Sequence, residues 1–365
     1  MLSPTITKDQ RTQSARQRLR TASSQTRSDV GAFLDHCPGE LDIASAEDLE
    51  LFYLAALLLR SQGRVEEVLA SGEFGLHRRE LIWATLATHL KSAGYELGKR
   101  YMPGWTNCDR LPEGVRYMEY FKEHPEAQCL SFRSARAIHA THHSSGRQVV
   151  LKIVCTRPGI LGDEELEILQ YLNSPELRKW SANAAVDLLD VVDFPSVSVE
   201  NDLAGDFRIV VMPALDRVVI SDCVIMAYAL DLMRQAFKPF FILVVSVTGS
   251  YTSIRIRAAP LIVISPHRRD IARRNLMVSH SPAGPLFLLR IIDFGQSFRI
   301  DFDDSDPLGL VARNTTRSPW VGGQIDVDPE SYSDPDSVHN PFKAEIYALG
   351  RTWQFFLSKN QCRRS

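Results

Sequence analysis

The chain has 365 residues, of which 44% are hydrophobic and 24% are charged, which is ordinary for a soluble globular protein. A formal net charge of −2 supplies no overall field that would draw the protein onto nucleic acid or an anionic membrane surface, so neither is expected as a partner. The longest apolar run, Phe240 to Val247, is far shorter than the roughly 20 residues of a membrane-spanning helix, so no membrane span is predicted.

The six cysteines predict a reducing compartment. They are scattered without a C-x-x-C pair, and the first residues of the chain contain no apolar core of a secretion signal. We therefore expect free thiols and a cytoplasmic or nuclear location.

Residues 1–40 are predicted to form a disordered basic tail. Residues 1–29 are rich in Arg, Ser, Thr and Gln and poor in apolar side chains. Such a segment cannot bury enough surface to offset the cost of ordering the chain. A mitochondrial transit peptide and a nuclear-import signal are the alternatives, and the missing apolar helix face argues against the first.

Residues 41–128 are predicted to form a helical extension followed by an irregular connector. The stretch Ser45 to Asp48 resembles a helix cap ahead of an Ala/Leu-rich run, and Leu76 to Ser92 carries an apolar stripe at helical spacing. Arg64 to Ala70 is predicted as a shorter helix between them. The glycines and prolines of residues 98–128 indicate the connector. We expect the extension either to pack on the rest of the protein or to serve as a protein–protein contact.

Residues 129–215 are predicted to form a small antiparallel β lobe. Apolar and β-branched runs flank the turn residues His142 to Gly146, a pattern typical of a hairpin. The elements expected in this lobe are strands at Leu130 to Thr141 and Arg147 to Cys155, a helix at Glu164 to Tyr171, and strands at Val186 to Phe194 and Phe207 to Leu215.

Residues 216–365 are predicted to form a mainly helical large lobe that is incomplete at its C-terminal end. Helices are expected at Asp222 to Phe237 and at Asn340 to Phe356, with a hairpin at Val278 to Ile292. The segment Lys238 to Pro266 is β-branched and lacks the pattern of a helix. The fold class expected for the whole chain is α+β.

Three short motifs carry the chemistry of the predicted site. Asp293 ends an apolar strand and is followed by Phe294 and Gly295, where a glycine permits a sharp turn, so its carboxylate is placed to hold a metal ion. Upstream of it, the loop His267 to Asn275 has the pattern D-x-x-x-x-N, which begins at Asp270. Further upstream, Lys152 lies on a β-branched strand.

In this order, a strand lysine, a D-x-x-x-x-N loop and a D-F-G loop resemble the signature of protein kinases. The phrases Asn340 to Glu345 and Leu188 to Val192 are similar to those of the divergent kinase-domain proteins abundant in mushroom-forming fungi (basidiomycete type). The resemblance covers about residues 130–355. It implies a two-lobed protein kinase-like fold, with the helical extension placed before it.

The resemblance also implies roles in phosphoryl transfer. Lys152 would hold the α- and β-phosphates of ATP, and Glu165 would orient it through an ion pair. Asp270 would accept the proton of the substrate hydroxyl group, and Arg274 would neutralise phosphate charge.

The remaining implied roles concern the cofactors, ATP and Mg²⁺. Asn275 and Asp293 would be the metal ligands. The backbone around Met212 and Leu215 would bind adenine in a hinge, while Val150 would pack on the ring. The implied function is a protein kinase that transfers the γ-phosphate of ATP to a protein substrate, on serine or threonine in preference to tyrosine.

The sequence departs from the kinase pattern in four places. No G-x-G-x-x-G precedes Lys152, and the catalytic loop reads His-Arg-Arg-Asp, one residue longer than usual. The segment 238–266 and the early end of the large lobe depart as well, and a misassembled gene model would explain both. A pseudokinase scaffold with weak or no phosphotransfer is therefore the main alternative. A small-molecule phosphotransferase is disfavoured, because Arg268 stands where that class has histidine.

Overall fold

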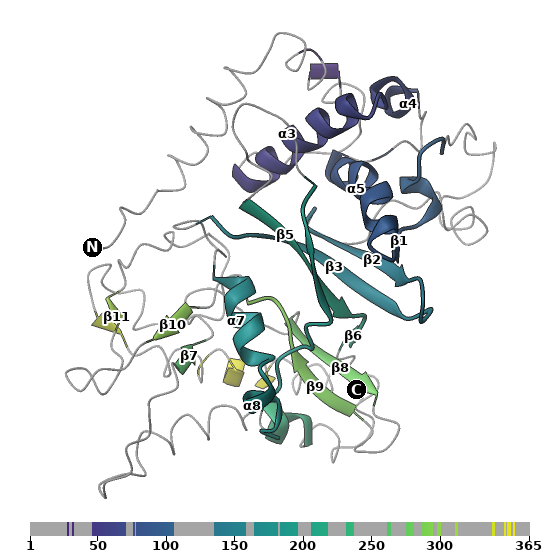
Figure 1. Ribbon diagram of the computed structural model, residues 1–365. Helices are drawn as coiled ribbons and strands as arrows, with labels where there is room; N and C mark the ends of the chain where they lie inside the picture. Colours follow the sequence, from purple (N-terminus) through teal and green to yellow (C-terminus); the bar gives the residue numbers. More distant parts are fainter. Residues whose placement is uncertain are drawn as a thin grey trace, which may run out of the picture. The chain divides into compact units, whose positions relative to one another are not determined.

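The computed structural model describes residues 28, 31–32, 46–70, 76, 78–105, 135–157, 164–181, 183–195, 206–217, 231–236, 261–263, 275–280, 287–294, 298–300, 311–312, 338–339, 347, 349–351 and 353–354 (Figure 1). The chain combines α-helices with antiparallel sheets, one of which is a curled sheet of five strands. Two compact units are present. We call the described residues within 6–155 and 189–214 the sheet unit, and those within 156–188 and 215–365 the hairpin unit.

The sheet unit begins with helices that the sequence predicted. Helix α3 spans Ala46–Ser61, α4 spans Val65–Leu69, and α5 spans Leu81–Ser92 after a single 3-10 turn, η1, at Arg78–Glu80. Helices α3 and α5 pack on each other, and α5 is buried along most of its length because apolar side chains surround it. Such a helix is stabilised by tertiary burial rather than by a single amphipathic stripe.

Hydrogen bonds and ion pairs of buried side chains hold the ends of these helices in place. Arg64 donates from Nη1 to the Ala84 carbonyl of α5 (2.6 Å) and contacts both carboxylate oxygens of Glu67 (2.8 and 3.1 Å). Just before α5, Glu80 is fully buried and accepts hydrogen bonds from Arg100 Nη2 (3.0 Å) and Tyr101 Oη (2.6 Å). Two donors and an opposite charge compensate the desolvation of that carboxylate.

The five strands of the sheet unit lie in the order β1-β2-β3-β5-β4, and every neighbouring pair is antiparallel. Their bounds are Tyr95–Glu96 for β1, Ala137–His142 for β2, Gln148–Cys155 for β3, Asp190–Asp193 for β4 and Phe207–Pro213 for β5. The predicted hairpin of β2 and β3 is confirmed. Strand β1 begins shortly after α5 ends, so the segment predicted as a helical extension also contributes an edge strand to the sheet.

One face of this sheet is the apolar core of the unit. Alternate residues of a strand point to opposite faces, and the register places a continuous set of buried side chains on one of them. Its members are Ile138, Ala140, Val149, Leu151, Ile153, Ile209 and Val211. Helix α5 is hydrogen-bonded at two places beside the sheet, from Trp83 Nε1 to the Ala135 carbonyl (2.7 Å) and between His89 Nε2 and the Asp193 carbonyl (2.8 Å).

A phenol–carboxylate contact joins the two edge strands across the same face. Tyr95 on β1 donates from Oη to Asp190 Oδ2 on β4 (2.7 Å), although β1 and β4 stand at opposite ends of the strand order. This reach requires the sheet to curl. Burial, and then the bond to Asp190, raise the pKa of Tyr95, so the phenol stays protonated and donates.

The hairpin unit contains short helices and three small antiparallel sheets among its described residues. Helix α7 spans Glu165–Leu172 and α8 spans Pro175–Arg178. The sheets are β6-β8-β9 (Asp216–Arg217, Leu276–His280 and Phe287–Ile291), β10-β7 (Phe298–Ile300 and Leu261–Val263) and β11-β12 (Val311–Ala312 and Val338–His339). Residues 231–236 are helical and so are the described residues of 347–354, within two of the predicted helices.

The predicted helix at 164–171 and the hairpin ending at Ile292 are confirmed as α7 and as β8 with β9. The strand predicted at Val186 to Phe194 is correct only from Asp190 onward. Residues 184–186 are hydrogen-bonded to β9 instead. The Val186 N–H donates to the Ile291 carbonyl (3.0 Å), and the Ile291 N–H donates to the Ala184 carbonyl (2.7 Å). A segment that reads as one strand is therefore used in two places.

Candidate functional site

Three of the predicted nucleotide-site residues share one face of the five-stranded sheet. Val150 lies directly opposite Met212 in the β3–β5 register, and Lys152, two residues further along β3, has Ala137 and Val210 as its cross-strand neighbours. Val150 and Lys152 are half-buried, whereas Met212 is buried. This is the face opposite Leu151 and the apolar core, because the side chains alternate along β3. A half-buried lysine beside apolar side chains is placed to meet a ligand that is partly apolar and partly anionic.

Leu215 is the second residue after β5 and the first after the chain leaves the sheet unit. It is half-buried, and the Ala214 N–H before it donates to the Gln148 carbonyl of β3 (3.2 Å). That bond continues the β3–β5 pairing to the end of the sheet unit. The backbone of the predicted hinge, Met212 to Leu215, is therefore hydrogen-bonded to β3 as far as the boundary of the unit.

Glu165 is the buried member of three neighbouring glutamates at the start of α7. It is 3% exposed, while Glu164 is half-buried and Glu167 is exposed. Its helical spacing puts it on the same side of α7 as the buried residues Ile168 and Leu169. Burial removes water from the Glu165 carboxylate, and hydrogen bonds or an opposite charge must offset the cost of that desolvation.

Asn275 and Asp293, the two predicted metal ligands, are brought together by the β8–β9 hairpin. Leu276 pairs with Ile291, and beyond that pair the Ile292 N–H donates to the Asn275 carbonyl (3.0 Å). Asn275 is therefore next to the residue that precedes Asp293. Asn275 is 4% exposed, Asp293 is half-buried, and Phe294 after it is 1% exposed.

The backbone at Asp293 is left-handed, with φ at 66°. Among the described residues it is the one residue other than glycine with a positive φ. Aspartate tolerates this conformation better than most side chains, but it still costs energy, and such residues cluster at functional sites. The sequence predicted the turn at Gly295, which lies outside the described residues; the left-handed backbone conformation is at Asp293, two residues earlier.

Asp270 and Arg274, the predicted catalytic base and phosphate-binding arginine, lie outside the described residues. Lys152, Val150 and Met212 belong to the sheet unit, and Glu165, Asn275 and Asp293 belong to the hairpin unit. Each group is thus assembled within its own unit: an apolar face with a lysine in one, and two oxygen ligands at the end of a hairpin in the other.

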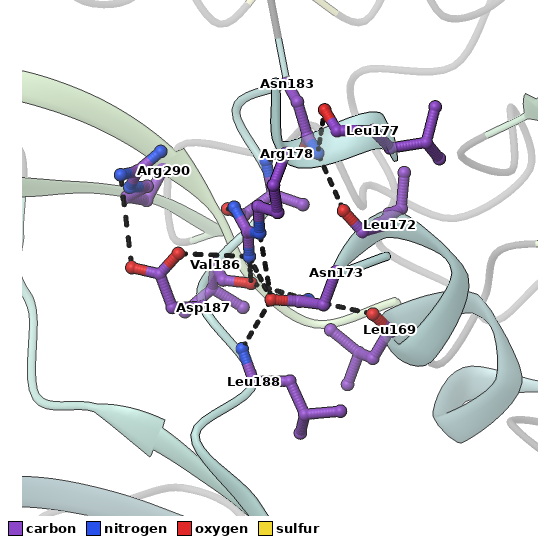
Figure 2. Close-up of polar contacts among 11 residues, drawn as sticks. Leu169, Leu172, Asn173, Leu177, Arg178, Asn183, Val186, Asp187, Leu188 and Arg290 are labelled. Atoms are coloured by element: carbon purple, nitrogen blue, oxygen red, sulfur yellow. Dashed lines mark hydrogen bonds and ion pairs between the residues drawn. The ribbon is translucent and has the colours of Figure 1, made fainter. Parts of the chain in front are cut away.

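Sequence reasoning missed a polar cluster in the hairpin unit formed by Asn173, Arg178, Asp187 and Arg290 (Figure 2). The local sequence did contain one signal, Ser174-Pro175, which is typical of a helix N-terminus. In the structure Ser174 is the N-cap of α8, with its side chain accepting a bond from the Leu177 N–H (3.5 Å). No local pattern announced that Asn173 and Arg178 would bond to the 185–188 backbone.

A scan against models of protein families and a search of curated proteins find no match to this chain. No helix within the described ranges is both long and apolar enough to cross a membrane. In the same part of the chain, no three His, Cys, Asp or Glu side chains gather as a group that could bind a metal.

Proposed function

We propose that this chain is a two-lobed, protein kinase-like phosphotransferase. It binds ATP with Mg²⁺ and transfers the γ-phosphate to a protein hydroxyl group, on serine or threonine in preference to tyrosine. The observation that carries the proposal is the β8–β9 hairpin, which brings Asn275 beside the Ile292–Asp293 step and leaves Asp293 in a left-handed backbone conformation.

The two ligand side chains suit the metal. Mg²⁺ is held in phosphoryl-transfer sites by one or two protein oxygen ligands together with phosphate oxygens, so a cage of three or more acidic side chains is not required. Asn275 and Asp293 supply an amide oxygen and a carboxylate at one end of a hairpin. The bound ion would neutralise charge on the transferred phosphoryl group.

The sheet unit would supply the nucleotide contacts. Val150 and Met212 face each other across β3 and β5, which suits packing against an adenine ring, and Lys152 lies on the same face for the phosphates. In this proposal Glu165, a buried carboxylate at the start of α7, keeps the role that the resemblance to protein kinases assigns to it. Leu215 would contribute backbone groups to adenine, Asp270 would take the hydroxyl proton, and Arg274 would neutralise phosphate charge.

A pseudokinase scaffold is the second candidate, and one observation favours it. The turn between β2 and β3 contains a single glycine, Gly146, with φ at 64°. The sequence before Lys152 has no glycine-rich cover for the phosphates, so ATP would be held with fewer backbone contacts than kinases normally provide. In a scaffold the fold would persist and phosphotransfer would be absent.

The proposal is tested by Mg²⁺-dependent ATP binding and by phosphorylation of a generic protein substrate. We expect each variant to lower turnover by roughly 100-fold or more, because Asp293→Ala removes a ligand of the metal ion and Lys152→Met removes the positive charge that contacts the phosphates. Matched controls are Asp231→Ala and Lys91→Met, which make the same changes in the same units, at a half-buried helical residue outside the predicted site and at an exposed helix end.

If the controls and the site variants behave alike, the site assignment is wrong. If the wild type binds Mg–ATP and transfers no phosphate, the scaffold is supported instead. A wild type that binds no nucleotide at all contradicts both candidates.

A further inference from the structure

The cluster of Figure 2 ties the end of α7 to the strand that leads to Asp293. Asn173 follows α7 directly, and its side chain uses both of its polar atoms. Its Nδ2 donates to the Leu169 carbonyl (2.8 Å) and to the Val186 carbonyl (3.2 Å). Its Oδ1 accepts from the Leu188 N–H (2.8 Å). One side chain therefore joins the last turn of the helix to the segment 186–188.

Arg178, at the end of α8, completes the connection. It donates from Nε to Asn173 Oδ1 (3.0 Å), from Nη1 to the Ala185 carbonyl (3.0 Å) and from Nη2 to the Val186 carbonyl (2.8 Å). Its Nη2 also contacts Asp187 Oδ1 (3.1 Å). The planar guanidinium thus spans helix, loop and segment at once, a geometry that lysine cannot reproduce.

The segment held by this arginine is itself bonded to β9. Ala184, Ala185 and Val186 are buried, and Val186 N–H and Ala184 carbonyl form the two bonds to Ile291. The next residue, Ile292, donates to the Asn275 carbonyl, and Asp293 follows. Hydrogen bonds, together with the backbone that links them, therefore connect Arg178 through residues 184–186 and Ile291 to the backbone beside both predicted metal ligands, all within the hairpin unit.

Burial and two charged neighbours, Asp187 and Arg290, act on the Arg178 guanidinium. Burial lowers the pKa of Arg178 and the neighbouring Arg290 lowers it further, whereas Asp187 raises it. Arg290 Nη2 is 4.0 Å from Asp187 Oδ2, so Asp187 lies between the two arginines. The backbone carbonyls of 185 and 186 replace the water that burial removes from the guanidinium.

We propose that Arg178, with Asn173, is a positioning residue that holds α7 and β9 in fixed register and thereby sets Asn275 and Asp293 for the metal ion. The inference rests on the proposed function. It adds that metal binding depends on a cluster that contains neither metal ligand. Loss of the cluster would let β9 and residues 184–186 separate, and the Asn275–Asp293 pair would lose its spacing.

The test uses the full chain carrying Arg178→Lys, with Asn173→Ala as a second variant and Arg234→Lys as the matched control. Arg234 is an exposed arginine of the same unit, paired with Asp231. Amide hydrogen exchange at Ile291 and Ile292 should be roughly 10-fold faster in both cluster variants and unchanged in the control, because charge-assisted bonds that hold the neighbouring segment are lost.

The activity readout is the Mg²⁺ concentration that gives half-maximal turnover, compared with the KM for ATP. We expect the Mg²⁺ requirement to rise several-fold in Arg178→Lys with little change in the KM for ATP. A loss of folded protein alone would reduce the amount of active enzyme and leave the Mg²⁺ requirement unchanged.

An active wild type whose folded Arg178→Lys variant keeps both the exchange rates and the Mg²⁺ requirement overturns the positioning role alone. A wild type without Mg–ATP binding overturns the proposed function and the catalytic part of this inference together, and the exchange rates then report whether the cluster holds β9 in place.

Discussion

The two units hold their candidate site residues by different forces. In the sheet unit, Val150 and Lys152 stand on a strand whose other face is packed with apolar side chains. In the hairpin unit, Asp293 follows a strand whose neighbour, residues 184–186, is held by the polar atoms of Asn173 and Arg178. Apolar packing weakens in proportion to the atoms removed, whereas a buried polar network fails when one partner leaves the others unsatisfied. The stability of the sheet unit should therefore fall gradually with the size of the core side chain removed. In the hairpin unit, the loss of one polar partner should have a large effect by itself.

The largest effect on stability is expected from the core of the sheet unit. Leu151 is fully buried at the centre of β3, so Leu151→Ala should cost about 2–5 kcal/mol of unfolding free energy. Denaturant unfolding measures this value. Leu151→Met keeps most of the side-chain volume and should cost less than about 1.5 kcal/mol. Equal costs for the two variants would contradict packing as the force that holds β3.

A smaller effect is expected from the contact that joins the edge strands. Tyr95→Phe removes the hydrogen bond to Asp190 and keeps the ring, so it should cost about 1 kcal/mol, because water can solvate the exposed Asp190 carboxylate. Amide exchange at β1 and β4 should increase in this variant. If the cost matched that of Leu151→Ala, polar contacts would dominate the sheet unit as well, and the contrast between the units would fail.

The smallest effect is an acid dependence of the helical part of the sheet unit. The bond from Arg64 is the main cause that holds the pKa of Glu67 below its ordinary value, helped by the Gly104 N–H and opposed by burial. A lowered folded pKa means that the unfolded chain binds the proton more readily, so the contribution is present above the unfolded pKa and is lost as pH falls through the folded one.

Stability measured from pH 7 downward should therefore decline below about pH 4.3, the ordinary pKa of a glutamate, by less than about 1 kcal/mol from this group. Glu67→Gln should remove that part of the decline. Glu66→Gln, an exposed change on the same helix, should leave it in place. The opposite ranking of the two variants would show that the Arg64 contact is not responsible.

Much of the fold followed from local patterns. Alternating β-branched residues predicted β3, β5 and the β8–β9 hairpin, and apolar spacing predicted α3, most of α5 and α7. Strand β1 was missed because two residues carry no periodicity. The strand at 186–194 was predicted too long, because Asn173, Arg178 and Ile291 take the polar groups of its first half, and those partners lie elsewhere in the sequence.

The features of the candidate site also divide into those that local sequence predicts and those that depend on tertiary contacts. Motif order selected Asn275, Asp293 and Lys152, and Glu165 was selected because it lies three residues before the apolar pair Ile168-Leu169. Residue type and spacing are local features. The left-handed backbone at Asp293 and the cluster around Arg178 arise from tertiary contacts. They were not visible in any window of the sequence, so the residues that position the ligands were harder to predict than the ligands themselves.

The central claim is that Asn275 and Asp293 together hold the metal ion that accompanies the nucleotide. Its most direct test is paramagnetic broadening of assigned backbone amide signals by Mn²⁺ with ATP. The signals of Leu276 and Ile292, the amides adjoining the two ligands, should broaden in the wild type and remain sharp in Asp293→Ala. Equal broadening in both proteins, or broadening that spares these two amides, would contradict the claim.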